Sequence, residues 1–596
     1  MTRTPLRPLA RILDARQRGE NPDAIERENL RLRHEAMRDS ARRRAEGRLV
    51  VLAGAFVLAF GVVGLRMGLM AAAEPQEPRA ELAGNPIVGQ RADITDRNGR
   101  VLATNLSTYA LYAQPPKLID RVGAAKKLAA IFPDLDEERL VKDFTGTRKF
   151  LWIKKKVSPE QRQAVHDIGD PGLLFGPREM RLYPNGRLAA HVLGGASFGR
   201  EGVNSAEVIG VAGIEKAMDD TLRDPARGGA PLVLSIDMTV QSTMREVLYG
   251  GMRLMNAKGA AGILMDIDSG EILSMVSLPD FDPNDRPRPL TKGDAGDSPL
   301  FNRAVQGVYE LGSVFKIFAV AQAMELGLVG PNTLVDADAP MKWGRFTLRE
   351  FQNKNYGPLL SVSDVITKSS NVGTAKLALQ IGPERQKAFL ESFGVFDPTP
   401  VELVEASGAK PLLPPKWSEI VAITASYGHG FSASPLHLAA AYSSLLNGGT
   451  KVEPTLLKRD GAPSGNRLVS ERVSRASAKM LRQVVLEGTA SFGRVPGYEV
   501  GGKTGTANKP IAGRKGYYKD KNINTFASVF PADDPAYVLI VMLDEASDNS
   551  GREPRRTAGW TAVPVAAEVI RRTAPLLGLR PKIEPVAASG VTLASE

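Results

Sequence analysis

Ser313 and Lys316 have the spacing of a nucleophile and its base. They open a run of mostly apolar residues that predicts a buried helix ending at Gly327, and residues three apart share a helix face. A serine hydroxyl is a weak nucleophile at neutral pH, but the pKa of a lysine amine falls in a partly desolvated site until the amine can accept the serine proton. At a helix start, Ser313 also has a backbone N–H to donate to an oxyanion. An N-cap serine with a surface lysine has the same spacing, so the pair needs partners elsewhere in the chain.

Ser369-Ser370-Asn371 stands directly before a second helical pattern. Ser369 has the chemistry to relay a proton between a lysine and an attacking or leaving amine, and Asn371 to hold a substrate carbonyl or position the lysine. Taken alone, the three residues are more typical of a helix N-cap. Both interpretations stay open at this point.

Gly501 to Thr506 (GGKTGT) predicts a strand that suits an anionic substrate. Lys503 and Thr504 fit a carboxylate, and Gly505 admits a substrate backbone at the strand edge. The backbone N–H of Thr506 is a candidate second oxyanion donor. A surface turn with a solvated lysine is the alternative. Lys-Thr-Gly is expected by chance in roughly one chain in ten of this size, so it is the most informative of the three motifs.

The composition excludes most other kinds of catalytic site. The chain has 596 residues, a formal charge of +11 and no cysteine, which removes disulfides, thiolate nucleophiles, iron–sulfur clusters and cysteine-based zinc sites. The five histidines are His34, His166, His191, His429 and His437. None of them pair at i, i+4, which disfavours a histidine-built metal site. The chemistry must therefore use hydroxyls, amines or carboxylates, in a chain too long for one compact domain.

The N-terminal region predicts a membrane anchor. Residues 1–48 hold 13 Arg, no Lys and 8 acidic residues, and the uncharged run Leu49–Leu65 follows directly. That run is roughly 25 Å long as a helix, near the lower limit for crossing the hydrocarbon, and Met67–Ala73 extends it. The flanking positive charge predicts a cytoplasmic N-terminus and argues against reading the arm as a nucleic-acid binder. A signal peptide cleaved at Ala71–Ala73 and a buried core helix are the alternatives.

The remainder of the chain predicts two modules with an α+β layout. The first begins with short strands (92–97, 101–105 and 109–114) and continues with helices at Ala124–Phe132 and Pro159–Ile168. The second begins near Pro231, and its expected elements are a strand at 232–237, a helix at Met238–Met255, a hairpin of Ala260–Met265 with Glu271–Ser277, and late strands at Tyr498–Gly501, Thr525–Phe530 and Tyr537–Leu543. Because helix-rich sequence separates the early strands from the late ones, distant strands are expected to share one sheet.

Ser-x-x-Lys, Ser-x-Asn and Lys-Thr-Gly in this order resemble the signature set of penicillin-binding proteins and serine β-lactamases. The resemblance runs from about Gly89 to about Thr573 and favours a class B penicillin-binding protein, the division-associated septal peptidoglycan transpeptidase. The further segments that carry it are Asp93–Gly99 with Leu102-Ala103, Arg181–Pro184, Ala190–Gly194, Gly213–Glu215, Gly270–Leu273, Pro279–Asn284, Ser369–Gly373 and Tyr427–Gly430. The chain departs from the pattern at Leu311, where proline is frequent, and at Ala92, where glycine is commoner.

The resemblance implies a penicillin-binding/β-lactamase-like transpeptidase domain, with an antiparallel sheet and helices on both faces. It also implies a β-rich pedestal and a single transmembrane helix. The implied domains are a cytoplasmic Arg-rich tail at 1–48, an anchor at 49–73, a non-catalytic pedestal (dimerisation/interaction) domain at 74–230, the transpeptidase domain at 231–575 and a C-terminal tail at 576–596.

The resemblance further implies a D,D-transpeptidase of the inner membrane that cross-links stem peptides in the periplasm and is inhibited by β-lactams. Its substrates are D-Ala-D-Ala ends, and its implied partners are division proteins, including a glycosyltransferase, and not nucleic acid; no cofactor or metal is implied. The roles carried over are nucleophile for Ser313, general base for Lys316, proton relay for Ser369 and Asn371, and substrate binding by the strand of Lys503, Thr504, Gly505 and Thr506, with Lys503 also placed among the catalytic residues.

Three other functions remain in play from the sequence. An elongation-type transpeptidase shares the three motifs. A serine β-lactamase or D,D-carboxypeptidase shares the nucleophile but passes the acyl group to water, and the chain lacks the Glu-x-x-Leu-Asn pattern that supplies a deacylating carboxylate in class A β-lactamases. A non-catalytic sensor or scaffold would not require all three motifs intact.

Overall fold

The computed structural model describes residues 7–72, 91–201, 206–398, 401–511 and 516–582. The chain forms two compact units, one of Met1–Glu77, Tyr112–Ile153 and Gln163–Leu174, and the other of Pro78–Leu111, Lys154–Arg162 and Phe175–Glu596. Gly89, where the family resemblance was expected to begin, lies outside the described residues, as do Ala73 at the expected cleavage site and most of the C-terminal tail.

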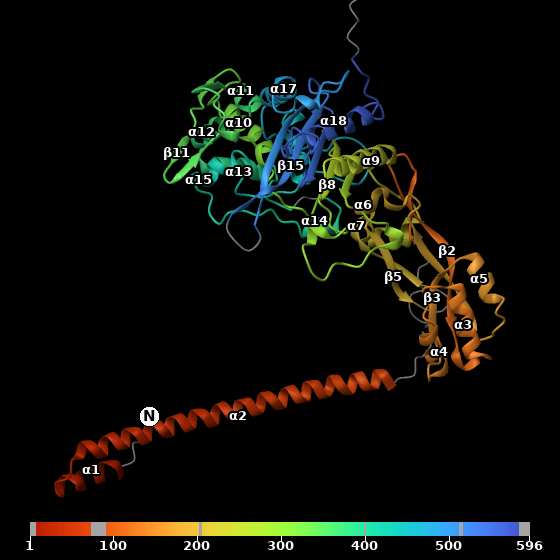
Figure 1. The fold of residues 1–596 in the computed structure, drawn as a ribbon, viewed down its shortest axis with the longest axis vertical. Coiled ribbons are helices and arrows are strands. Elements are labelled where there is room, and N and C mark those ends of the chain that lie inside the picture. Colours follow the sequence, from red (N-terminus) through yellow and green to blue (C-terminus); the bar gives the residue numbers. More distant parts are fainter. Residues whose placement is uncertain (1–6, 73–90, 202–205, 399–400, 512–515, 583–596) are drawn as a thin grey trace, which may run out of the picture. The chain divides into compact units, whose positions relative to one another are not determined.

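Two helices make up the N-terminal part of the first unit (Figure 1). They are α1 (Arg7–Gln17) and the 51-residue α2 (Pro22–Ala72). Within α2, Glu46–Met67 has a mean hydropathy of 2.3, and none of it is buried. Within the described residues, none of this apolar window is buried as a core helix would be, which contradicts the buried-core alternative. A length of 22 residues and this composition suit a single membrane-spanning anchor.

A pair of helices packs together in the rest of the first unit. They are α3 (Arg121–Ile131) and α4 (Glu137–Thr145), with Leu128 and Phe144 fully buried. The helix expected from Ala124 begins three residues earlier, because the Asp120 carboxylate caps it by accepting a hydrogen bond from the Gly123 N–H.

The pedestal sheet has the strand order β3-β2-β1-β7, with β4 also paired to β2. The elements of this part are β1 (Ile94–Thr95), β2 (Val101–Ala113), β3 (Leu151–Val157), α5 (Pro159–His166), β4 (Leu173–Leu182), α6 (Ala190–Leu193), β5 (Gly195–Glu201), β6 (Ala206–Ala212), α7 (Gly213–Ala217), α8 (Asp219–Arg223) and β7 (Leu232–Val233). The strand expected at 232–237 in the second module is shorter than expected and pairs in parallel with β1, so it belongs to this sheet. The sequence prediction of separate strands at 101–105 and 109–114 was wrong. They form the single strand β2, because no proline or glycine interrupts the run between them.

A buried ion-pair cluster holds this part of the second unit together. The Glu215 carboxylate accepts hydrogen bonds from Arg91 Nε at 2.6 Å and from Arg181 Nε at 2.7 Å, and all three side chains are almost completely buried. Arg91 also pairs with Asp219. Removing one partner from such a cluster strands a buried charge, which typically costs about 3–5 kcal/mol. Arg181 and Glu215 lie in segments that carry the family resemblance, and the cluster gives both a structural reason.

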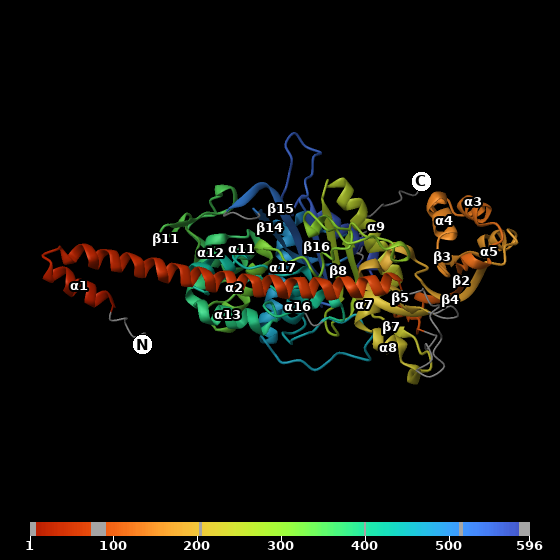
Figure 2. The same ribbon diagram turned by 90° about the horizontal axis from the view of Figure 1, so that it is seen from below.

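The second of the two expected modules is built on a five-stranded sheet with the order β14-β15-β16-β8-β9, antiparallel throughout. These strands are β8 (Gly259–Asp266), β9 (Ile272–Leu278), β14 (Gly501–Pro510), β15 (Tyr517–Phe530) and β16 (Tyr537–Asp544), and several of them run side by side in Figure 2. The prediction that early and late strands share one sheet is confirmed. Tyr498, expected at a strand start, instead lies in a turn that bonds to Val495.

Helices cover both faces of this sheet, as expected. The helices of this part of the chain are α9 (Met238–Leu254), α10 (Lys316–Glu325), α11 (Val362–Thr367), α12 (Asn371–Ile381), α13 (Pro383–Ser392), α14 (Val404–Ser407), α15 (Glu419–Ala425), α16 (Pro435–Leu446), α17 (Glu471–Glu487) and α18 (Ala562–Thr573). Short strands β10 (Leu334–Asp336), β11 (Met341–Trp343), β12 (Phe346–Leu348) and β13 (Leu359–Ser361) form two small hairpin-like sheets. The helices α9 and α18 contact one face of the large sheet, and α16, whose residues are all buried, covers the other.

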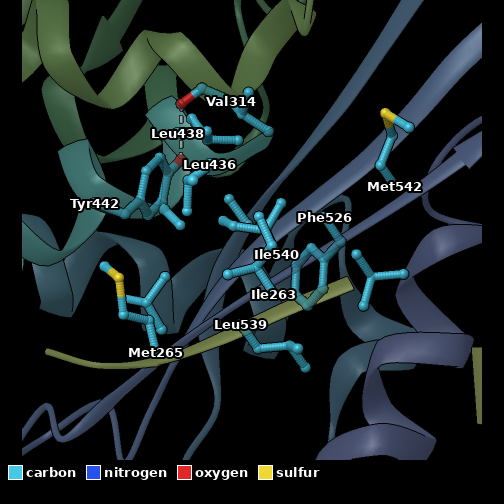
Figure 3. Close-up of a cluster of buried hydrophobic side chains, with 14 of the residues drawn as sticks. Ile263, Met265, Val314, Leu436, Leu438, Tyr442, Phe526, Leu539, Ile540 and Met542 are labelled. Carbon is cyan, nitrogen blue, oxygen red and sulfur yellow. Dashed lines mark hydrogen bonds between the residues drawn. The ribbon is translucent and has the colours of Figure 1, made fainter. Parts of the chain in front are cut away.

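The core on the α16 side supports the turn that carries Ser313. Figure 3 shows Ile263 and Ile540 of the sheet gathered with apolar residues of α16. The Tyr442 hydroxyl donates a 2.7 Å hydrogen bond to the carbonyl of Val314, the residue after Ser313. Tyr442 is fully buried, so this bond ties the turn to the core at a defined point.

Candidate active site

Ser313 lies in a tight turn that leads into a buried helix. Gly312–Phe315 form a 3-10 turn, and Lys316 begins α10. The neighbours of Ser313 are buried, whereas Ser313 itself is partly exposed. The helix ends at Glu325, two residues before the expected Gly327, which has φ +70°. The turn therefore offers the serine hydroxyl to solvent from a rigid base.

A second loop presses against this turn and fixes its conformation. The Gly312 N–H donates a 3.1 Å hydrogen bond to the Gly428 carbonyl. Gly428 has φ +78°, and a Cβ there would lie 2.0 Å from the Gly312 oxygen. Only glycine fits this approach. Gly428 belongs to the Tyr427–Gly430 segment of the family resemblance, and its contact with the turn of Ser313 gives that glycine a structural reason.

Lys316 is completely buried and surrounded by acceptors from the second motif. Its Nζ donates to the Ser369 carbonyl at 2.5 Å, to Ser369 Oγ at 3.1 Å and to Asn371 Oδ1 at 2.7 Å. Burial lowers the pKa of Lys316 to about 7, against the opposing effect of the Glu350 charge. In the described part of the chain Ser313 Oγ makes no hydrogen bond, and such contacts often tighten only when substrate binds.

Lys503 approaches the same serine from the sheet. It lies on β14, is completely buried, and donates to Ser369 Oγ at 2.9 Å and to the Thr504 carbonyl at 3.2 Å. The surface-turn alternative is therefore wrong. Burial, followed by repulsion from Lys316, lowers the pKa of Lys503 well below its usual value. Ser369 Oγ thus lies between two buried amines, which disfavours a full positive charge on both.

The structure confirms the N-cap interpretation of Ser369-Ser370-Asn371, and the proton relay stays a prediction that the contacts of Ser369 with two lysines support. Ser370 is the N-cap of α12, and its Oγ accepts a hydrogen bond from the Gly373 N–H. Ser369, just before the cap, has φ +61°, a left-handed conformation that costs a non-glycine residue about 1–3 kcal/mol. This conformation directs both the carbonyl and the hydroxyl of Ser369 to Lys316.

The strand β14 lies directly against the turn of Ser313. A Cβ on Gly505 would lie 2.2 Å from the Leu311 carbonyl oxygen, so glycine is required here by the turn, whatever it offers to a substrate. A Cβ on Gly312 would lie 3.0 Å from the Thr506 carbonyl oxygen. The backbones of Ser313 and Thr506 are therefore neighbours, as the two-donor oxyanion hypothesis requires.

Residues outside the three motifs hold the threonine side chains of β14 in place. Thr504 Oγ1 shares a 2.7 Å hydrogen bond with Thr489 Oγ1, and Thr506 Oγ1 accepts one from the Ala558 N–H at 3.0 Å. The structure thus brings all eight predicted site residues into one region. The contacts join segments up to 193 positions apart, from Ser313 to Thr506.

The sequence reasoning missed two acidic residues beside this region. Glu310 Oε1 accepts hydrogen bonds from the Gly430 N–H and the Tyr517 hydroxyl, both at 3.0 Å. Glu350 is almost completely buried and binds the Ser370–Val372 segment. A single glutamate in a loop-like segment forms no recognisable motif with its neighbours in the sequence. Only the position of Glu310 three residues before Ser313 could have drawn attention to it.

Two protein-family models match the chain. The penicillin binding protein transpeptidase domain matches residues 260–570, and the penicillin-binding protein dimerisation domain matches residues 86–228. The probable peptidoglycan D,D-transpeptidase FtsI of Caulobacter vibrioides is 36% identical over 510 residues, covering 84% of this chain and 83% of that protein. The chain belongs to the class B penicillin-binding proteins.

More distant members of this family also match the chain over most of its length. The peptidoglycan D,D-transpeptidase FtsI of Escherichia coli is 28% identical over 477 residues, covering 76% of this class B penicillin-binding protein and 79% of its relative. The crystal structure of penicillin-binding protein 3 of Mycobacterium tuberculosis complexed with ampicillin has a TM-score of 0.62 at 26% identity. It covers 84% of this chain and 97% of that one.

Proposed function

We propose that this class B penicillin-binding protein is the septal peptidoglycan D,D-transpeptidase, working through an acyl-serine on Ser313. The observation that supports it most is the meeting of Lys316 and Lys503 on Ser369 Oγ, beside the turn that exposes Ser313. In this arrangement Lys316 provides the base, Ser369 the proton relay and the strand of Lys503 the cationic binding edge. An elongation-type transpeptidase remains the alternative, and the Tyr427–Gly430 segment and the FtsI names of its relatives favour division.

Acylation follows from these positions. Neutral Lys316 takes the proton of Ser313, whose oxygen attacks the penultimate D-Ala carbonyl. The backbone N–H groups of Ser313 and Thr506 stabilise the oxyanion. As the tetrahedral intermediate collapses, the C–N bond breaks and the departing D-Ala amine receives the proton from Lys316 through Ser369. A hydroxyl both donates and accepts, so Ser369 can pass the proton on.

Transfer reverses these steps with a new amine. The acceptor amine loses a proton to Lys316 through Ser369 and attacks the ester, and the Ser313 oxygen leaves with the proton returned to it. The strand of Lys503 and Thr504 binds the donor carboxylate during acylation. Asn371 orients the Lys316 amine through its Oδ1.

We also propose the cell-level arrangement and the domain limits. The tail at 1–48 is cytoplasmic, the anchor spans 49–73, and the pedestal at 74–230 binds division proteins, including a glycosyltransferase. The transpeptidase domain at 231–575 and the C-terminal tail at 576–596 lie in the periplasm. The asymmetry of arginine around the apolar helix supports this orientation.

The fate of the acyl-enzyme separates a transferase from a hydrolase. We expect a penicillin to label Ser313 in a stoichiometric burst with negligible turnover, because its leaving group stays tethered and shields the ester. With stem-peptide substrates, a peptide amine added at rising concentration should divert released acyl groups into cross-linked product. Mass spectrometry and product chromatography measure both. Sustained penicillin hydrolysis, with water product dominating at high amine, would assign the chain to the β-lactamases or carboxypeptidases.

Protease treatment of spheroplasts tests the orientation. Added protease should digest the chain beyond about residue 75 and leave a short membrane-bound N-terminal fragment, because the arginine-rich side stays in the cytoplasm. A cytoplasmic protein provides the control for intact membranes. Protection of the transpeptidase domain would contradict the orientation, and a mature chain beginning near Glu74 would establish a cleaved signal instead.

A further inference from the structure

Glu350 is a buried acid that binds the second motif from outside the three signature segments. It follows β12, and only 3% of it is exposed. Its Oε1 accepts a 2.6 Å hydrogen bond from Ser370 Oγ and a 3.2 Å bond from the Val372 N–H. Its Oε2 accepts a 2.7 Å bond from the Asn371 N–H. The carboxylate therefore binds the first turn of α12, where backbone N–H groups otherwise lack partners.

The contacts continue into the neighbouring residue. The Asn371 side chain donates from Nδ2 to the Arg349 carbonyl at 3.0 Å, while its Oδ1 accepts from Lys316. Residues 349 and 350 thus fix both the backbone and the side-chain orientation of Asn371. They also hold the chain immediately after Ser369, whose left-handed conformation would otherwise relax.

The charges around Lys316 come from three elements. Lys503 approaches from β14, His429 from the loop at 427–430, and Glu350 from the segment after β12. Burial, followed by repulsion from Lys316, lowers the pKa of Lys503, and burial lowers the pKa of His429, which favours its neutral form. Glu350 is the carboxylate that acts on Lys316, and it favours the protonated amine. Burial, followed by the Glu350 charge, raises the pKa of the Tyr356 phenol.

We propose that Glu350 is a positioning residue that acts through Lys316, holding Ser369 and Asn371 around the amine and supplying its counter-charge. The inference rests on the proposed function, since it assumes that Lys316 is the base for Ser313. It assigns two separable tasks to one carboxylate. The geometric task sets the maximal rate of acylation, and the electrostatic task sets the pH at which acylation begins.

Glu350→Gln removes the charge and leaves the side chain nearly the same size. Without the carboxylate the ammonium form of Lys316 loses stabilisation, so the neutral base forms at lower pH. The rate of acylation by a fluorescent penicillin rises with pH as the base loses its proton, and we call this rise the acid limb. In Glu350→Gln the acid limb should therefore lie about one pH unit lower than in the wild type. The plateau rate should fall about tenfold or more, because an amide nitrogen cannot accept the Asn371 N–H bond and Asn371 shifts.

Two further variants separate geometry from charge. Glu350→Asp keeps the charge on a shorter side chain, and Ser370→Ala removes one donor to the carboxylate. Both should lower the plateau with the acid limb near its wild-type position. Glu402→Gln is the matched control, because the Glu402 carboxylate also accepts from a hydroxyl, that of Thr455, and from a backbone N–H, that of Leu456. It should lower the melting temperature and leave the acid limb in place.

The outcomes decide between these statements. An unmoved acid limb in Glu350→Gln, or an equal movement in Glu402→Gln, would overturn the electrostatic task. If Glu350→Gln does not fold, the other two variants test the geometric task. Plateau rates equal to the wild type in both Glu350→Asp and Ser370→Ala would overturn it. If the wild-type protein is not labelled at Ser313, the proposed function itself fails. If Ser313 is labelled and the Glu350 variants are acylated like the wild type, only the proposed role of Glu350 is refuted.

Discussion

Ser313→Ala is expected to abolish covalent labelling by a fluorescent penicillin. The strained amide of the drug mimics the D-Ala-D-Ala carbonyl in the same proposed oxyanion site, and Ser313 Oγ is the atom that we propose forms the ester. Because Ser313 is partly exposed and its Oγ makes no hydrogen bond among the described residues, the variant should fold normally. Intact-mass spectrometry checks for the loss of the adduct, and the melting temperature checks the fold.

A serine away from the site provides the control for this experiment. Ser242 lies on the exposed side of α9, and Ser242→Ala should label at the wild-type rate. Peptide mapping then places the adduct of the wild-type protein. An adduct that persists in Ser313→Ala on another residue would refute the assignment of the nucleophile.

Lys316→Arg is expected to slow acylation by about 10²- to 10⁴-fold, the usual contribution of a general base. Arginine keeps the positive charge, but its guanidinium does not lose a proton in this pH range. Because Lys316 is completely buried, the longer side chain will also overpack its site and cost about 1–3 kcal/mol of folding free energy. Lys316→Met, which removes the amine without this enlargement, should slow acylation to a similar extent.

The pH dependence of the wild-type protein tests the same base. With the pKa of Lys316 lowered to about 7 by burial, the neutral amine predominates above that pH and the ammonium below it. Acylation should therefore rise as pH increases through about 7 and level off above it. A rate that is flat from pH 5 to 9, or a near-normal rate in Lys316→Arg, would show that Lys316 is not the base.

The order and chemistry of the motifs could be predicted from the sequence because they are local. Ser313 and Lys316 are three residues apart, and Ser370 caps a helix whose pattern begins beside it. Helix and strand patterns of this kind extend over a few residues, so α9, β8 and β16 were located to within one or two residues. The absence of cysteine likewise needed no structure to exclude thiolate chemistry.

The protonation states of Lys316 and Lys503 could be inferred only from the tertiary structure. The sequence places Lys503 on a strand but leaves a solvated surface turn as an alternative, whereas in the fold burial and then repulsion from Lys316 lower its pKa. Desolvation depends on everything packed around a group, and the elements around Lys503 come from segments more than a hundred residues apart.

The remaining site geometry was decided in the same way. Ser369 is left-handed, and the two residues after it bind Glu350, which lies 19 residues earlier in the chain than Ser369. Gly505 is required by a carbonyl of Leu311, from a strand and a turn that meet only in the folded protein. By itself the sequence determined which groups are candidates for the chemistry and on which elements they lie. Their burial, strain and charge environment arise from contacts between distant segments, which no local pattern records.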